Sequence, residues 1–165
     1  MLDITKTITV ARSAEDCFLY VGDVRKLIEW DPAVSGTSKE SMGPVAKGSY
    51  FTVRVEIGAI KIPFRYIITE YTPNRRIVIA GRSSFLNVND TIELRESDGQ
   101  TTITYHAEFH FKFGVERLFP GLAEALDRQC GLAINGLKSA LTETADEAIL
   151  SPRNAKADVK TLSAL

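Results

Sequence analysis

The residues best suited to chemistry lie in one short segment, TYHAEFHFKFG at residues 104–114. It contains both histidines of the chain, His106 and His110, with Glu108 midway between them. Residues two apart on a β-strand point to the same side, so a strand here would align two imidazoles and a carboxylate. Imidazole and carboxylate groups bind zinc and also serve as general acids and bases. The segment therefore raises two hypotheses, a metal site and an acid–base site.

Strand geometry argues against a metal ion shared by the two histidines. They would lie about 13 Å apart on one strand, whereas zinc–nitrogen bonds measure about 2.1 Å. The opposite face is apolar, and burying each large apolar side chain gains about 1.5–3 kcal/mol. We therefore predict no metal site, and we expect the histidine face to lie in water. A bulge near residues 111–114 would exchange the faces and turn His110 inward. The apolar face consists of Ile103, Tyr105, Ala107, Phe109, Phe111 and Phe113.

The elements that must position this segment begin with one strand and two short helices. Residues 4–10 alternate apolar and polar side chains, which is typical of a strand. Ser13 is a suitable N-cap for a helix over 14–21, and Asp23 for a second helix that ends before Pro32. The expected buried residues of the two helices are Cys17, Phe18 and Val21, then Val24, Leu27 and Ile28.

A β-rich region follows, in which turn signals separate the segments YFTVRVEI, KIPFRYIITEY, RRIVIAGR, NDTIELRE and TTITYHAEFHFKF. Short connections favour an antiparallel meander, with one buried face and one wet face. Arg54 and Arg65 fall on the polar sides of their strands. Asp90 is in phase with Ile92 and Leu94, so it either points inward or belongs to a turn.

From Leu118 the apolar residues recur at steps of three and four, which predicts an amphipathic helix of about 30 residues. Gly121, Gly131 and Gly136 inside it indicate either close packing on the sheet or space kept open beneath the helix. The order of one strand, two short helices, about six strands and one long helix predicts an α+β fold, in which a curved antiparallel sheet wraps the helix. We assign residues 1–150 to a single domain and 151–165 to a flexible tail.

Composition argues against several functional classes. The formal net charge is −1, from 20 basic and 21 acidic residues, so the broad basic field required for nucleic-acid binding is absent. No apolar run approaches about 18 residues, so we expect no stable membrane insertion. The N-terminal segment does not resemble a signal peptide, which favours the cytoplasm. Cys17 and Cys130 form no metal or redox motif, and no cofactor motif occurs, so we expect no cofactor. Nothing in the sequence predicts an oligomeric state.

Several local motifs occur in a characteristic order. They are Ala14-Glu15-Asp16-Cys17-Phe18, Asp23 with Trp30-x-Pro32, Gly43-Pro44-x-x-x-Gly48, Thr69-Glu70-Tyr71-x-Pro73-x-Arg75, Asp90-x-Ile92, Thr102-x-Thr104-Tyr105-x-Ala107-Glu108-Phe109 and Gly114. Over roughly residues 3–142 this order resembles the START-like (SRPBCC, helix-grip) superfamily, which includes bacterial polyketide cyclase/dehydrase-like and lipid-transfer proteins. The resemblance implies a deep apolar cavity between the helix and the concave sheet, which takes lipids, sterols, polyketides or plant hormones. A minority of relatives catalyse cyclisation, dehydration or hydrolysis.

We therefore expect the chain to bind or transport a small apolar ligand, lipid or polyketide-like. One alternative is a cyclase/dehydratase-type enzyme in which Tyr66, Tyr105 or His110 moves protons, and another is a protein-interaction module. The two tyrosine hydroxyls are expected to orient the polar end of a ligand. Trp30 either anchors its helix or forms part of the rim, and Cys130 is expected to be an inert buried thiol. The candidate ligand-binding residues are Trp30, Phe51, Val53, Val55, Phe64, Tyr66, Ile68, Ile92, Tyr105, Ala107, Phe109, His110, Phe119, Leu122, Leu126 and Cys130.

Overall fold

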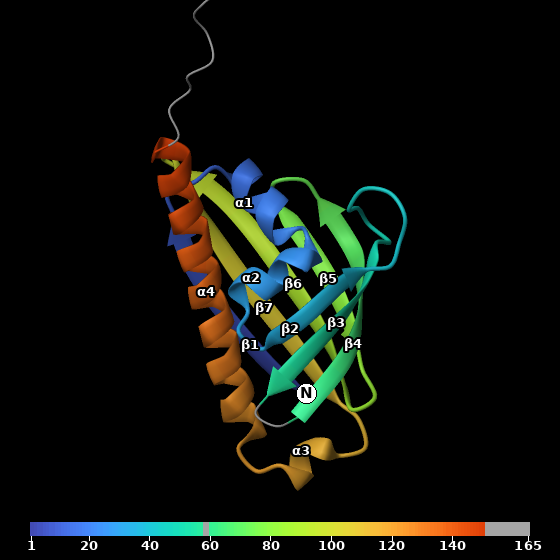
Figure 1. The fold of residues 1–165 in the computed structure, drawn as a ribbon. Coiled ribbons are helices and arrows are strands. Elements are labelled where there is room, and N and C mark those ends of the chain that lie inside the picture. The colour runs from blue at the N-terminus through green and yellow to red at the C-terminus, as the bar shows by residue number, and fades with distance from the viewer. Residues whose placement is uncertain (58–59, 151–165) are drawn as a thin grey trace, which may run out of the picture.

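The computed structural model describes residues 1–57 and 60–150. Figure 1 shows a curved sheet with the long helix α4 lying along it, while α1 lies near one end, α2 beside the middle of α4 and α3 at the other end. The predicted α+β helix-grip architecture is confirmed. The predicted tail over 151–165 lies outside the described residues. The elements are β1 (Leu2–Val10), α1 (Ala14–Val21), η1 (Val24–Lys26), α2 (Leu27–Trp30), β2 (Val34–Lys39), β3 (Tyr50–Ile57), β4 (Ile60–Thr72), β5 (Arg76–Arg82), β6 (Leu86–Ser97), β7 (Gln100–Phe111), α3 (Val115–Leu118) and α4 (Leu122–Leu150).

Within the described residues the seven strands form one antiparallel sheet in the order β1-β7-β6-β5-β4-β3-β2. Strands β2 to β7 are a meander, and β1 closes onto β7 at the far edge. Register shifts occur between Val34 and Gly36 in β2 and between Ile68 and Glu70 in β4. Such bulges bend the strands that carry them, which is consistent with the curvature of the sheet.

The short helices bury the predicted faces with one exception. Ser13 caps α1 by accepting a hydrogen bond from the Asp16 N–H at 3.1 Å. In the second helical segment, Val24 and Trp30 are buried, but Ile28 is 51% exposed, so its predicted burial is wrong. The reason is that this segment begins as the 3-10 helix η1, in which residues three apart align. Positions 24, 27 and 30 therefore share the buried face.

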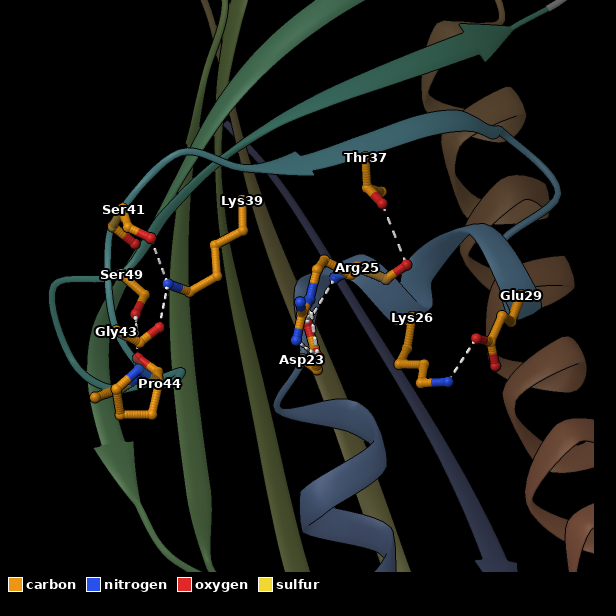
Figure 2. Close-up of polar contacts among 11 residues, drawn as sticks. Asp23, Arg25, Lys26, Glu29, Thr37, Lys39, Ser41, Gly43, Pro44 and Ser49 are labelled. Atoms are coloured by element: carbon orange, nitrogen blue, oxygen red, sulfur yellow. Dashed lines mark hydrogen bonds and ion pairs between the residues drawn. The ribbon is translucent and has the colours of Figure 1, made fainter.

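Polar contacts hold this helical segment against β2, as Figure 2 shows. Asp23 accepts hydrogen bonds from the backbone and the guanidinium of Arg25. The Thr37 hydroxyl of β2 donates to the Arg25 carbonyl at 3.2 Å. Lys26 forms an ion pair with Glu29 at 2.7 Å. These contacts order η1 and the start of α2, and the Thr37 hydrogen bond joins η1 to β2.

The long helix is shorter at its N-terminal end than the sequence pattern predicts. The separate turn α3 ends at Leu118, and Gly121 precedes α4 with a φ of +84°. Gly121 therefore breaks the helix and does not lie inside it, which corrects the prediction. A Cβ at Gly136 would overlap the carbonyl oxygen of Trp30, so this glycine permits close packing of α4 on α2. The buried face of α4 includes Leu126, Ala133, Leu137 and Leu141, as predicted.

Strand β7 directs its apolar face into the core. Ile103 and Ala107 are fully buried, and the pairing of β7 with β6 runs without a shift from Ser97–Gln100 to Leu86–Phe111. The bulge considered for His110 is therefore absent from this pairing, and His110 lies on the outer face. Phe113 lies beyond the strand at a φ of 58° and is 88% exposed, so its predicted burial is wrong.

Candidate functional site

The candidate site is a cavity between α4 and the concave face of the sheet. It consists of two adjoining lobes of about 80 and 50 Å³, which share Asp31, Val55, Tyr66, Asp90, Tyr105 and Ala133. We name the larger one the α4 lobe, because Leu126, Gln129 and Cys130 line it. The smaller one is the α2 lobe, lined by Leu27 and Trp30. Most of the remaining lining is aliphatic or aromatic, so the cavity suits an apolar body with a few polar groups.

A buried carboxyl group lies at the junction of the two lobes. Asp90 occupies the middle of β6 and is 8% exposed. The Tyr105 hydroxyl, from the neighbouring strand β7, donates a hydrogen bond of 2.7 Å to Asp90 Oδ1. Burial raises the pKa of Asp90 to about 7, against the lowering effect of the Tyr105 hydrogen bond, and the Asp31 charge adds to the rise. Asp90 can therefore exchange a proton near neutral pH.

A second carboxyl group enters the cavity from the end of α2. Asp31 Oδ1 accepts a hydrogen bond from the Ala33 N–H at 2.9 Å and another from Gln129 Nε2 at 3.1 Å. Burial raises the pKa of Asp31, and these two hydrogen bonds lower it. The contact with Gln129 joins α2 to α4 at the cavity wall. Asp31 and Asp90 thus approach the cavity from different elements.

Tyr66 supplies a hydroxyl from β4. Its ring stacks on Phe64 with the centroids 5.7 Å apart. Gly81 on the neighbouring strand makes room for it, because a Cβ there would lie 2.6 Å from both Tyr66 Cε1 and Val88 Cγ1. Among the described residues, no hydrogen bond joins the Tyr66 hydroxyl to another group. Burial raises its pKa well above the ordinary value, so the group remains a neutral donor or acceptor.

Cys130 adds a thiol to the α4 lobe. Burial, followed by the charges of Asp90 and Asp31, raises the pKa of this thiol to about 12. The thiolate is the nucleophilic form, and the raised pKa disfavours it. Both cysteines are free and buried. The described residues contain no cluster of three or more metal-ligating side chains.

The family of the chain follows from comparison with known sequences. A family model described as polyketide cyclase/dehydrase and lipid transport matches residues 1–142. The chain belongs to this family. No curated protein matches the chain in sequence. The matched residues include the whole of the sheet, most of α4 and all the residues that line the cavity.

Solved structures similar to this polyketide cyclase/dehydrase family member confirm the START-like fold. A START superfamily protein from Mycobacterium smegmatis has a TM-score of 0.67 at 18% identity, with 88% of this chain and 98% of that chain covered. The Zhui aromatase/cyclase from Streptomyces sp. R1128 has a TM-score of 0.66 at 15% identity, with 84% and 92% covered. The di-domain ARO/CYC StfQ from the steffimycin biosynthetic pathway has a TM-score of 0.68 at 15% identity; the match covers 91% of this chain and 52% of that protein.

The structure brings many of the candidate residues to the cavity and leaves others elsewhere. Phe51, Val53, Ile68 and Ala107 are fully buried in the solid core outside the lining. Leu122 is half-buried against the core, His110 lies on the outer face, and Phe119 is 49% exposed in the connection between α3 and α4. The candidates that line the cavity are Trp30, Val55, Phe64, Tyr66, Ile92, Tyr105, Phe109, Leu126 and Cys130.

The polar residues of the site were largely missed from the sequence. Asp90 was in phase with buried neighbours, which was the one available signal, and it does point inward. Asp31 and Gln129 gave no signal, because one ends a short helix and the other lies on a long helix far away in the sequence. The backbone of Trp30 packs on Gly136 of α4, and the residue also lines the α2 lobe.

Proposed function

We propose that this domain binds a small, mainly apolar molecule, lipid or polyketide-like, between α4 and the concave face of the sheet. The observation that carries the proposal is the cavity itself, whose walls are apolar except where a few polar groups converge. Such a combination is typical of small-molecule sites, where the apolar wall supplies affinity and the polar groups fix orientation. Membership of the polyketide cyclase/dehydrase and lipid transport family supports the same function.

The volume of the cavity limits the size of the ligand. The lobes measure about 80 and 50 Å³, whereas pockets for drug-sized ligands measure roughly 300–1,000 Å³. An apolar cavity of roughly 150 Å³ is enough for benzene. Together, the lobes of about 80 and 50 Å³ fall just short of that volume, so as they stand they suit a ligand of about one ring. A larger ligand requires the cavity to widen.

Filling the cavity provides a direct test. Ala133 lines both lobes and is 6% exposed, so Ala133→Phe places a ring in the space that a ligand would occupy. The matched control is Ala123→Phe, which puts the same ring on the exposed side of the same helix. The probe is toluene, a neutral apolar molecule with one ring, and its binding is followed by methyl NMR titration. Thermal melting checks that both variants fold.

We expect the wild type and Ala123→Phe to bind toluene alike, and Ala133→Phe to bind it at least about tenfold more weakly, since about 1.4 kcal/mol of lost contact is a tenfold change. Native mass spectrometry and solvent extraction of the purified protein test for a carried ligand. Equal binding by all three proteins would place the toluene outside the cavity. A wild type that neither carries nor takes up any apolar molecule would refute the proposal.

A cyclase- or dehydratase-type reaction is the second candidate function. The observation that favours it is the Asp90–Tyr105 pair inside the cavity, because a carboxyl group with a pKa of about 7 is suited to general acid–base catalysis. His110 lies on the outer face, so it takes no part in this proposed reaction. The test is turnover of a poly-β-ketone thioester. We expect Asp90→Asn to lower the rate about 10²–10⁴-fold while binding persists; an unchanged rate would refute it.

A further inference from the structure

Resting on the proposed function, we infer that the polar end of this cavity selects ligands that carry a protonated amine. The same end discriminates against ligands whose buried end is a carboxylate or a phosphate. Asp31 and Asp90 would receive the amine, and the apolar walls of the two lobes would enclose the rest of the molecule. The inference names the chemical class of the ligand, which neither the fold nor the family determines.

The first observation is an imbalance of charge in the lining. Two carboxyl groups, Asp31 and Asp90, line both lobes. Among the described residues that line either lobe there is no lysine, arginine or histidine. Buried acids normally have a basic partner, because an unpaired buried charge is strongly unfavourable. Here no basic partner occurs among the described lining residues, and a cationic ligand would supply it.

The second observation is unused hydrogen-bonding capacity at the same place. Asp90 Oδ1 accepts from Tyr105, and no other hydrogen bond reaches Asp90 within the described part of the chain. The Tyr66 hydroxyl lines both lobes and also lacks a partner there. Tyr66 is 9% exposed and Asp90 is 8% exposed, and their unpaired oxygens are not among the fully enclosed polar atoms, so they face the space of the cavity. In the α2 lobe the described residues leave one buried donor without a partner, the Trp30 Nε1–H. An ammonium group has three donors, which suits an array made of carboxylate and hydroxyl oxygens.

The groups that face Asp90 reinforce this preference. They are Tyr66 from β4, Tyr105 from β7, Cys130 from α4 and Asp31 from the end of α2. Each of them is neutral or negative, so a bound carboxylate would add a like charge to a desolvated acidic site. A bound ammonium would instead stabilise the ionised form of Asp90. Binding of the amine should therefore strengthen as the pH rises through the range in which Asp90 ionises.

A matched series of probes separates the ligand classes. The three probes are 2-phenylethylamine, 2-phenylethanol and phenylacetate, which share one ring and differ in the charge at the end of the chain. Binding is followed by methyl NMR titration of the full chain, which measures weak affinities and localises the contact. The variants are Asp90→Asn, which keeps the shape of the side chain, and Asp127→Asn, an exposed acid on α4 that pairs with Lys6.

For the wild type at about pH 8 we expect the amine to bind most tightly, the alcohol less tightly and the acid least. Because the pKa of Asp90 is about 7, the affinity for the amine should fall about tenfold between about pH 8 and about pH 6, while that for the alcohol changes little. Asp90→Asn should remove both the preference and its pH dependence and should still bind the alcohol. Asp127→Asn should behave as the wild type does.

The possible failures are distinguishable. If the alcohol binds at the cavity methyl groups but phenylacetate binds as tightly as the amine, the inference on ligand charge is overturned and the proposed binding function stands. If Asp90→Asn retains the preference for the amine, the assignment to Asp90 is overturned. If no probe shifts the cavity methyl signals at millimolar concentration, the proposed binding function itself is overturned. The methyl spectrum of each free variant shows whether it is folded.

Discussion

Replacing Asp90 by asparagine should make the stability of this domain less sensitive to pH. Asp90 has a raised pKa in the folded state, about 7, against the ordinary aspartate pKa of 3.8. Between these two values the folded state holds one more proton than the unfolded state, so the free energy of unfolding falls as the pH rises. The stability associated with the neutral carboxyl is complete at low pH and is lost by the time the pH exceeds about 7.

The size of the effect follows from the same two values. One unit of pKa difference corresponds to about 1.4 kcal/mol, so the wild type should lose about 3 kcal/mol through Asp90 between about pH 4.5 and about pH 8. Asp90→Asn carries no charge and escapes this loss. Between about pH 4.5 and about pH 8, the free energy of unfolding of the variant should therefore rise by about 3 kcal/mol relative to that of the wild type. The buried asparagine amide changes the free energy of unfolding by the same amount at every pH, so it does not affect this change with pH.

Urea unfolding at a series of pH values measures this difference directly. Asp127→Asn is the control, because its side chain is 57% exposed and its ion pair with Lys6 should contribute less than about 1 kcal/mol. A difference between Asp90→Asn and the wild type that stays constant from about pH 4.5 to about pH 8 would contradict the assignment of a raised pKa to this carboxyl group. A difference that reverses sign, with the wild type gaining stability at high pH, would contradict it more strongly.

Two further perturbations have defined outcomes. Gly136→Ala should destabilise the domain by about 1–3 kcal/mol, because the new methyl group would overlap the Trp30 carbonyl. Gly131→Ala, where no described atom lies within 4 Å of the new methyl group, should instead stabilise α4 by up to about 1 kcal/mol in urea unfolding; equal effects would refute the packing argument. Tyr105→Phe should raise the pKa of Asp90 above that of the wild type, since it removes a hydrogen bond that lowers it. Carboxyl ¹³C NMR titration checks this, and a lowered pKa would contradict it.

Much of the fold could be predicted from the sequence, because alternation and helical periodicity report burial directly. The inner face of β7 and the buried stripe of α4 are examples. Strand β2 was not predicted, because VSGTSK has little apolar alternation and pairs at the edge of the sheet. Phe113 was misplaced, since the strand ends at Phe111 and a positive φ then turns the chain outward. The apolar alternation over residues 103–113 does not show that the strand ends at Phe111.

The site was less predictable than the fold for a physical reason. Apolar wall residues such as Phe64 and Phe109 follow from strand phase alone. The polar residues depend on contacts between elements that are distant in the sequence, and the hydrogen bond between Gln129 and Asp31 is the clearest case. To predict which inward-facing residues line the cavity and which lie in the core, one must also know how α4 packs against the sheet. Phase therefore could not distinguish Val53, in the core, from Val55, which lines both lobes.

The pairing of β1 with β7 has a consequence for the order of folding. Strands β2 to β7 pair with their neighbours in the chain, so this meander can form hairpin by hairpin during synthesis. Strand β1 precedes them but pairs Val10 with Thr101 and Leu2 with Phe109. Its edge of the sheet cannot close until β7 has been made, and pairings between distant segments form slowly. Until then the apolar residues of β1 lack their native cover, and an unpaired strand can pair with another chain, so misassembly at this strand is a risk during synthesis.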